Sequence, residues 1–213
     1  MRGLCLACQP GGYNGPVDLL WTPWRYNYVT HMDQQQRQGV PDELSAWPGD
    51  EGCVFCNMIA ATDYAIAHGM DRAAAERASG IVQRARRNYI CVNRYPYTSG
   101  HLMVVPYDHQ KSLSALAADA ACEMMDLAQR VERALADLYH PDGFNIGMNL
   151  GKAAGAGVAG HLHLHALPRW TGDTNFLTTL GETRLLPEDL STTWERVRGA
   201  LAGDEPKPHT ASP

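Results

Sequence analysis

The sequence predicts an α+β fold in which an antiparallel sheet packs against one long helix. Five short runs have the composition and length of strands, and the longest helical pattern lies between the third and the fourth of them. Strands that follow one another, with a single long helix inserted, favour an antiparallel sheet over an alternating βαβ arrangement. At 213 residues, of which 45% are hydrophobic, the chain is long enough for one substantial domain with extensions.

The first half of the chain is expected to hold an extension, a helical region and three strands. Residues 1–51 show no clean periodicity and are interpreted as an irregular N-terminal extension. A short helical turn opens at Cys53, and an Ala-rich helix over residues 63–80 is closed by Gly80. The strand-like runs that follow are GIVQR, NYICVNR and HLMVVP. The first two predict a hairpin, and the third is a strand entered through a turn.

The second half is expected to hold the long helix, two strands and a final helix. Apolar side chains recur at spacings of three and four over residues 112–139, which predicts a helix ended by Pro141 and Gly143. The remaining strand-like runs are FNIGMNLG and HLHLHALPRW. A last helix is expected to begin near Pro187, a residue suited to a first turn, and the tail 204–213 is expected to be disordered.

Charge and composition argue against several classes of protein. The chain has 23 acidic and 18 basic residues, and its net charge of −5 argues against a nucleic acid as the main partner. No apolar run approaches the roughly 20 residues needed to cross a bilayer, so no membrane partner is expected. The first residues, MRGLCLACQPGGYNG, lack the apolar segment and cleavage site of a secretory signal. A cytoplasmic protein is therefore expected.

Six cysteines include two C-x-x-C pairs, formed by Cys5 with Cys8 and by Cys53 with Cys56. In a reducing compartment such pairs indicate metal or redox chemistry rather than a disulfide framework. A redox pair is typical of a strand-to-helix junction in a βαβ unit, and no such pattern surrounds Cys53. Metal binding is therefore favoured for the second pair, with two reduced, buried thiols as the alternative. A four-cysteine site that adds Cys5 and Cys8 is a further alternative.

Three histidines, His161, His163 and His165, stand at every second position in GHLHLHALPRW. Alternate side chains of a strand share a face, so the imidazoles would line one face while the leucines between them enter the core. A solvated polar face is the simplest interpretation, but three of the nine histidines within five positions disfavour it. A cupin-type metal centre is a second interpretation, weakened because only His209 follows His165.

Nucleophilic catalysis is the third interpretation, and the loop upstream favours it. The stretch NLGKAAGAGVAG, residues 149–160, supplies glycines whose backbone N–H groups can come close to an anion and form a nest. An imidazole with an ordinary pKa of about 6.5 is mostly unprotonated at neutral pH, so it keeps a lone pair for attack. A phosphate cradle beside a row of imidazoles indicates attack on phosphorus.

These blocks together resemble the histidine-triad (HIT) family of nucleotidyl hydrolases and transferases. The resemblance rests on H-x-H-x-H followed by PRW, with N-x-G-x-N-x-G upstream, and it extends from Cys53 to Phe176. VNRYPYTSGHLMVVPYDH, PRWTGDTNF and LWTPWRYNYV are similar to a bacterial branch related to diadenosine polyphosphate phosphorylases and hydrolases. The resemblance places a HIT domain at residues 52–203. It also implies a five-stranded antiparallel sheet and a homodimer with the long helix near the interface.

The resemblance implies roles for several residues. His163 would attack the α-phosphorus of a nucleotide and form a covalent nucleotidyl-histidine intermediate, which water or phosphate would then release. His165 would help to position the phosphate or the leaving group. The implied substrate is a dinucleoside polyphosphate such as diadenosine tetraphosphate, or a related phosphoanhydride, with no organic cofactor. The residues expected to bind the nucleotide are Asn93 at the ribose, Asn149, Gly155 and Gly157 at the phosphate, and Val54 and Phe55 beside the base.

The resemblance also implies a structural zinc ion. Its ligands would be Cys53, Cys56, His109 and His161, a closed tetrahedral set in which His161 anchors the strand beside the catalytic pair.

Two features depart from the family pattern. Gly157 stands where many members carry a hydroxyl or amide side chain, in a loop that is one residue longer. The segment between Cys56 and Ile81 is also longer, with an Ala-rich insert.

Two rival functions remain open from the sequence. One is a nucleotide-binding sensor with negligible turnover, and the other is a metal-dependent, cupin-like enzyme. Arg169, near the end of the last strand-like run, is interpreted either as a contact to a distal phosphate or as a member of a surface ion pair. Asp173 is expected to cap a turn rather than to take part in chemistry.

Overall fold

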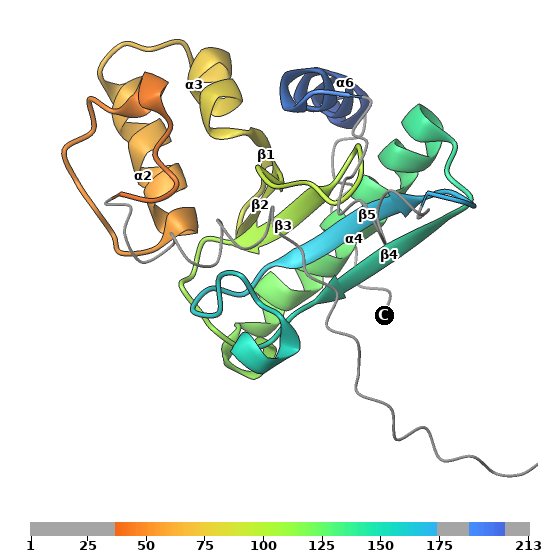
Figure 1. The fold of residues 1–213 in the computed structure, drawn as a ribbon. Coiled ribbons are helices and arrows are strands. Elements are labelled where there is room, and N and C mark those ends of the chain that lie inside the picture. Colours follow the sequence, from red (N-terminus) through yellow and green to blue (C-terminus); the bar gives the residue numbers. More distant parts are fainter. Residues whose placement is uncertain (1–36, 174–187, 203–213) are drawn as a thin grey trace, which may run out of the picture.

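The fold, a computed structural model, describes residues 37–173 and 188–202 and confirms the α+β class. Five strands form one antiparallel sheet in the order β1-β2-β3-β5-β4 (Figure 1). The strands are β1 (Ile81–Arg84), β2 (Asn88–Val92), β3 (Leu102–Pro106), β4 (Gly143–Met148) and β5 (Leu164–Arg169). The helices are α2 (Val54–Ala67), α3 (Arg72–Ser79), α4 (Ala118–Tyr139) and α6 (Leu190–Ala202). Cys5, Cys8 and the tail 204–213 lie outside the described residues.

One face of the sheet packs against α4 and α6. Ile90, Val104 and Leu164 point to this face and form a core with Met124 and Leu135 of α4. These side chains are essentially inaccessible to water, and each contributes roughly 1.5–3 kcal/mol by its burial. The periodic apolar stripe of α4 therefore faces the sheet, as the spacing predicted. The helix lies behind β5 and β4 in the view of Figure 1.

The opposite face is covered at one end by α2. Tyr89 and Cys91 of β2 and Val105 of β3 alternate with the residues of the first core and pack against Phe55 and Met58 of α2. Figure 1 shows α2 and α3 gathered at one side of the molecule, away from β4. Because α2 covers only the β1–β3 end, the same face can hold a site further along the sheet.

The Ala-rich region forms two helices instead of the one helix predicted over residues 63–80. The first, α2, runs on from the turn at Cys53 to Ala67, and the chain then turns at Gly69, whose φ is 96°. Asp71 caps the second helix by accepting a hydrogen bond from the Ala74 N–H at 2.9 Å. The helix ends at Gly80 as predicted, because that glycine adopts the left-handed conformation.

The other two helices begin later than predicted. Residues 113–115 form a separate 3-10 turn and Leu116 is extended, so α4 begins at Ala118 instead of residue 112. The last helix begins at Leu190, because Asp189 accepts a hydrogen bond from the Thr192 N–H at 2.8 Å and caps the first turn. Pro187 lies outside the described residues.

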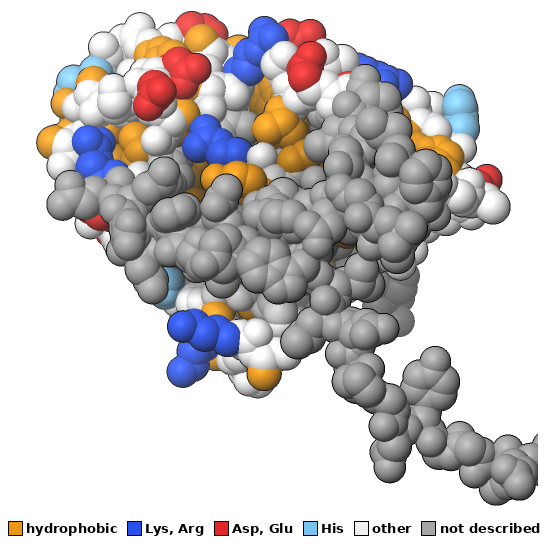
Figure 2. Space-filling view, in the orientation of Figure 1, with side chains coloured by type: hydrophobic (Ala, Val, Ile, Leu, Met, Phe, Trp, Pro, Cys, Tyr) orange, Lys and Arg blue, Asp and Glu red, His pale blue; other side chains and the backbone are white. Residues whose placement is uncertain are grey.

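The surface of the described residues mixes charges of both signs. In the view of Figure 2, basic and acidic side chains alternate across the upper part of the molecule. Among the described helices, none combines the length and the apolar character that crossing a membrane requires.

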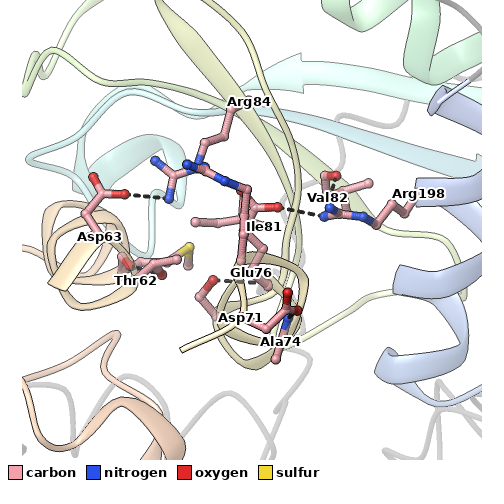
Figure 3. A network of polar contacts seen from close by, with 12 residues as sticks. Thr62, Asp63, Asp71, Ala74, Glu76, Ile81, Val82, Arg84 and Arg198 are labelled. Atoms are coloured by element: carbon pink, nitrogen blue, oxygen red, sulfur yellow. Dashed lines mark hydrogen bonds and ion pairs between the residues drawn. The ribbon is translucent and has the colours of Figure 1, made fainter. Parts of the chain in front are cut away.

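A buried carboxylate links α2 and α3 to the rest of the fold. The side chain of Glu76, on α3, is only 6% exposed, and it lies 3.1 Å from Arg84 of β1 and 2.8 Å from Arg198 of α6 (Figure 3). Arg84 also pairs with Asp63 of α2 at 2.8 Å. Charge-assisted hydrogen bonds of this kind are stronger than neutral ones, so the cluster connects α2, α3, β1 and α6.

Replacing Glu76 with Gln should lower the free energy of unfolding by roughly 3 kcal/mol, because two guanidinium groups lose a shared and largely buried carboxylate. Equilibrium urea unfolding followed by circular dichroism measures this loss. The matched control is Glu195→Gln in the exposed pair with Arg77, where a change below about 1 kcal/mol is expected. Equally small losses in both variants would show that the cluster does not hold α2 and α3 in place.

Candidate functional site

The segment that holds the three histidines is only partly a strand. β5 begins at Leu164, so His161 and His163 lie before it, whereas the sequence predicted that all three belong to one strand. In the register that pairs Val104 with Leu164, Pro106 would face Leu162 two positions further on. Proline has no N–H to donate, so the ladder stops there.

The alternation nevertheless persists beyond the ladder. Leu162 donates its backbone N–H to the Gln110 carbonyl at 2.6 Å, and its side chain packs in the α4 core. The rings of His161 and His163 lie on the other side, against Phe55, with centroid distances of 5.4 and 5.0 Å. The predicted separation of imidazoles from leucines is therefore present, although hydrogen bonds outside the sheet maintain it.

His161 is turned toward the two thiols of the C-x-x-C pair. Its Nδ1 lies 3.4 Å from the Cys53 Sγ and 3.6 Å from the Cys56 Sγ. The Nδ1 of His109 lies 3.3 Å from the Cys56 Sγ, and all four candidate ligand atoms lie within 4.8 Å of one another. The N-cap and the first turn of α2 supply the thiols and the segment after β3 supplies His109, so the fold brings together the four residues that the resemblance implied.

This cluster has the dimensions of a tetrahedral metal site. Metal–sulfur and metal–nitrogen bonds of zinc would separate sulfur and nitrogen ligands by about 3.5 Å, close to the separations found here. His161 Nε2 donates to the Pro106 carbonyl at 2.9 Å, which leaves its Nδ1 lone pair facing the thiols. Burial, with the nearby Cys53, raises the pKa of the Cys56 thiol to about 12. A metal cation bound between the ligands would stabilise the thiolate and so offset this rise in the pKa.

His163 has a different partner from His161. Its Nδ1 lies 2.8 Å from the backbone carbonyl of His161, and since a carbonyl only accepts, Nδ1 carries the proton. The lone pair of the neutral ring therefore resides on Nε2. The residue is only 5% exposed, and burial lowers the pKa of His163, so the neutral form is favoured at neutral pH. This ring has the protonation pattern that a nucleophile requires.

His165 contacts a further histidine, His101, that was not predicted as a site residue. The His101 Nε2 lies 2.9 Å from the His165 Nδ1, and His101 is 1% exposed. One signal could have identified it: His101 lies two residues before Met103, on the same face of the sheet, and the register pairs Met103 with His165. A histidine at the start of HLMVVP is otherwise indistinguishable from a core residue.

The structure places Asn93 beside His101. Its backbone N–H donates to the His101 carbonyl at 3.0 Å, and its Nδ2 lies 3.2 Å from the His101 Nε2. Its Oδ1 accepts from the Tyr95 N–H at 2.9 Å, which fixes the orientation of the amide. Asn93 therefore lies within the histidine cluster, at the end of β2.

The glycine-rich loop leads from β4 back to the histidines. Gly155 ends a short 3-10 turn over Lys152–Ala154 and has a φ of 85°. Val158 packs against the core that contains Phe55, and a Cβ on Gly160 would lie 3.9 Å from the His109 Nε2. The loop therefore closes near the site.

The remaining predicted residues fall into two groups. Phe55 is buried against the rings of the triad, and Val54 lies at the edge of the same core. Asn149 and Gly157 lie in the loop, and both are half-buried. No hydrogen bond to an imidazole is found for either within the described residues, so the structure places them near the site only through the path of the loop.

Arg169 forms an ion pair, which was one of the two interpretations. Its Nε and Nη2 contact the Asp173 carboxylate at 2.6 and 2.8 Å. Its Nη1 also donates to the Asn145 Oδ1 at 2.6 Å. Asp173 caps the following turn, as predicted, by accepting from the Trp170 N–H at 3.2 Å.

The cupin-like interpretation does not fit this geometry. A shared metal centre would need two or three of the alternating histidines to point at one ion. Within the described residues, the group of side chains close enough to share one ion includes His161 but neither His163 nor His165.

Comparison with known proteins agrees with the family resemblance described above. The model of the HIT domain matches residues 74–172. The chain is 34% identical over 182 residues to an AP-4-A phosphorylase of Mycobacterium tuberculosis, an alignment that covers 85% of this chain and 83% of that protein. A zinc-bound histidine triad family protein from Mycobacterium smegmatis is 26% identical, with a TM-score of 0.52, covering 73% of this chain and 96% of that one. A histidine triad nucleotide-binding protein from Sulfolobus tokodaii, 22% identical with a TM-score of 0.51, has the same fold and covers 71% of this chain and 93% of that one.

Replacing Gly100 with Ala should lower the free energy of unfolding by roughly 3 kcal/mol. Gly100 precedes His101 with a φ of 75°, and an added Cβ would lie 3.0 Å from the Tyr139 ring and 3.2 Å from Leu135. The left-handed backbone costs about 1–2 kcal/mol and the crowding adds about 1 kcal/mol.

The matched control is Gly172→Ala, where φ is 81° and an added Cβ meets no neighbour within 4 Å. It should lose only the backbone part, again about 1–2 kcal/mol. Chemical denaturation of both variants gives the comparison, and a loss in Gly100→Ala no greater than in Gly172→Ala would contradict the crowding expected at Gly100.

Proposed function

The chain belongs to the histidine-triad (HIT) family, and on that premise we propose that it cleaves dinucleoside polyphosphates by transferring a nucleotidyl group to His163. The observation that carries the proposal is the bond from His163 Nδ1 to the His161 carbonyl, which leaves the lone pair on Nε2. The similarity to an AP-4-A phosphorylase over most of the chain favours diadenosine tetraphosphate as the substrate and phosphate as the acceptor.

The reaction would proceed in two displacements at one phosphorus atom. First, the Nε2 of His163 bonds to the α-phosphorus, the bond to the bridging oxygen breaks, and its electron pair leaves with ATP. Then an oxygen of inorganic phosphate attacks the same phosphorus, the P–N bond breaks, its electron pair returns to Nε2, and ADP is released. Dividing the transfer in this way replaces one difficult step by two easier ones.

The surroundings of His163 would support the developing charge. Backbone N–H groups of the glycine-rich loop, which includes Gly155 and Gly157, would donate to the non-bridging phosphate oxygens, with Asn149 at the start of that loop. Asn93 would hydrogen-bond the ribose, while Val54 and Phe55 would flank the base. His165 would help to position the leaving group. Support for this arrangement comes from the position of Phe55 against the His163 ring and of Asn93 within the histidine cluster.

We also propose that Cys53, Cys56, His109 and His161 hold a structural zinc ion. A bound zinc ion would supply no reaction step; it would fix the first turn of α2 to the histidine segment. Its effect on chemistry would pass through His161, whose carbonyl orients His163. The zinc-bound relative supports this assignment, as do the sulfur–nitrogen separations described above.

A homodimer is part of the proposal. Within the described residues β4 is an edge of the sheet, and we propose that its outer backbone groups pair with a second copy. Ile146 on this strand and Leu150 just after it are 39% and 46% exposed, which is unusual for large apolar side chains near a sheet edge.

Incubation with adenine-labelled diadenosine tetraphosphate, followed by an alkaline quench, should trap an acid-labile adduct. The adduct should be absent from His163→Ala, because that variant has no Nε2 to attack phosphorus. His68→Ala, in which an exposed imidazole stacked on Tyr64 is removed, is the matched control and should retain the label. Binding without an adduct or product would favour a nucleotide sensor instead.

The same incubation with and without inorganic phosphate identifies the acceptor. Phosphorolysis should give ADP and ATP only when phosphate is present. AMP formed regardless of phosphate would show that water is the acceptor and would contradict the phosphorylase assignment.

Elemental analysis should find about one zinc per chain, as expected for one closed four-ligand site. Cys53→Ser should lose most of this zinc because the hydroxyl is a poor zinc ligand. Cys122→Ser, which removes an exposed thiol on α4, should retain it. Full zinc occupancy in Cys53→Ser would contradict the ligand set.

A further inference from the structure

We propose that a pocket beside Cys56, separate from the space around His163, binds a small organic ammonium ion with an apolar body. The pocket has a volume of about 320 Å³, at the lower end of the range for small-molecule sites. The described residues that line it include neither His163 nor His165, and none of the glycine-rich loop. The inference therefore concerns a second site and does not depend on the proposed reaction.

One helix face and the ends of two strands form the walls of this pocket. On α2, the lining residues recur at spacings of three and four and so share a face of the helix: Cys56, Ile59, Ala60 and Asp63. On the sheet, Tyr89 lies in β2, Pro106 ends β3, and Tyr107 follows directly. Most of the lining is therefore apolar, which suits the hydrocarbon part of a ligand.

Three aromatic residues, Phe55, Tyr89 and Tyr107, contribute to the lining. The rings of the two tyrosines lie beside each other, with centroids 5.4 Å apart. The Tyr89 hydroxyl already has a partner, since it donates to the Phe55 carbonyl at 3.3 Å. Aromatic rings attract an organic cation through their quadrupole, and several rings together are a common site for ammonium groups. The lining thus favours a cation over an anion of the same shape.

The charges at the pocket favour a cation as well. Glu51 and Asp63 line it, and both residues are exposed to solvent. Asp63 is balanced by Arg84 at 2.8 Å (Figure 3). The ion pairs found among the described residues do not include Glu51, whose backbone N–H is held by the Asn57 Oδ1 at 2.6 Å. One carboxylate therefore remains to pair with the ammonium group of a ligand.

The pocket shares two residues with the surroundings of the proposed nucleophile. The Phe55 ring also packs on the His163 ring, with centroids 5.0 Å apart, and the His161 carbonyl accepts from the His163 Nδ1. A bound ammonium ion would contact Phe55 and His161 from the side away from His163. Binding at this pocket and binding of a nucleotide at the histidines should therefore be compatible.

Three probes of similar shape and different charge test the inference on the full-length protein supplied with zinc: 2-phenylethylammonium, 2-phenylethanol and phenylacetate. Isothermal titration calorimetry should show that the ammonium ion binds about fivefold more tightly than the alcohol, the gain expected for an exposed ion pair, and that phenylacetate binds more weakly than either. Equal affinities for the ammonium ion and the alcohol, tightest binding of phenylacetate, or no binding of the ammonium ion would overturn the proposal.

A charge-removing variant tests the role of Glu51. Glu51→Gln keeps the size of the side chain, so it should remove the preference for the ammonium ion and leave the affinity for 2-phenylethanol unchanged. The matched control is Glu43→Gln, at an exposed carboxylate of the same segment that does not line the pocket; it should bind all three probes as the native chain does. A full preference for the ammonium ion in Glu51→Gln would contradict the assignment.

A pocket-filling variant and a competitor locate the bound probe. Ala60→Leu adds a side chain to the lining and should abolish binding of the ammonium ion and of the alcohol, while saturating AMP should leave the affinity for the ammonium ion unchanged. Undiminished binding to a folded Ala60→Leu, or displacement by AMP, would place the probe elsewhere and overturn the proposal. If thermal melting shows that Ala60→Leu does not fold, Glu51→Gln and the AMP competition still decide. A failure of AMP itself to bind would count against the proposed function alone.

Discussion

Hydrogen bonds between backbone groups and imidazole nitrogens are the constraint on which the site depends. The carbonyls of Pro106 and His161 each accept from one ring, and they do so at different ring nitrogens. His161 is thereby left with a bare Nδ1 and His163 with a bare Nε2. Residues of one type, two positions apart, are given different chemistry by the carbonyl that each ring meets. The backbone carbonyls therefore determine which nitrogen of each ring carries the proton.

The proline at the end of β3 makes this arrangement compatible with the sheet. A residue with an N–H at position 106 could extend the ladder toward Leu162 and use the carbonyl for strand pairing. With proline there, the carbonyl accepts from His161, and the segment before β5 pairs with Gln110 instead. The strand is thus shorter than the alternating pattern implies. His161, which does not pair in the sheet, lies beside the two thiols at the start of α2. The Glu76 cluster contributes to the same arrangement, because it holds α2 and α3 against the sheet.

Much of the fold was predictable because it follows from periodicity. The five strands, the hairpin between β1 and β2, and the apolar stripe of α4 match alternating or three-and-four spacings. Helix starts were less predictable, since they depend on single capping residues such as Asp71 and Asp189 within polar stretches. The thiol and imidazole cluster was predicted through resemblance, not spacing. His101 escaped notice because its partner lies 64 positions away and meets it only through the pairing of β3 with β5.

The distance between Cys53 and His161 along the chain has a consequence for how the protein is made. The two residues are 108 positions apart, and the intervening segment contains four of the five strands. Contacts of such wide separation form late, because the entropy of closing the loop must first be met by other contacts. During synthesis the thiols leave the ribosome well before the histidine that completes their cluster. For that interval the two thiols lack the imidazole that lies beside them in the finished fold.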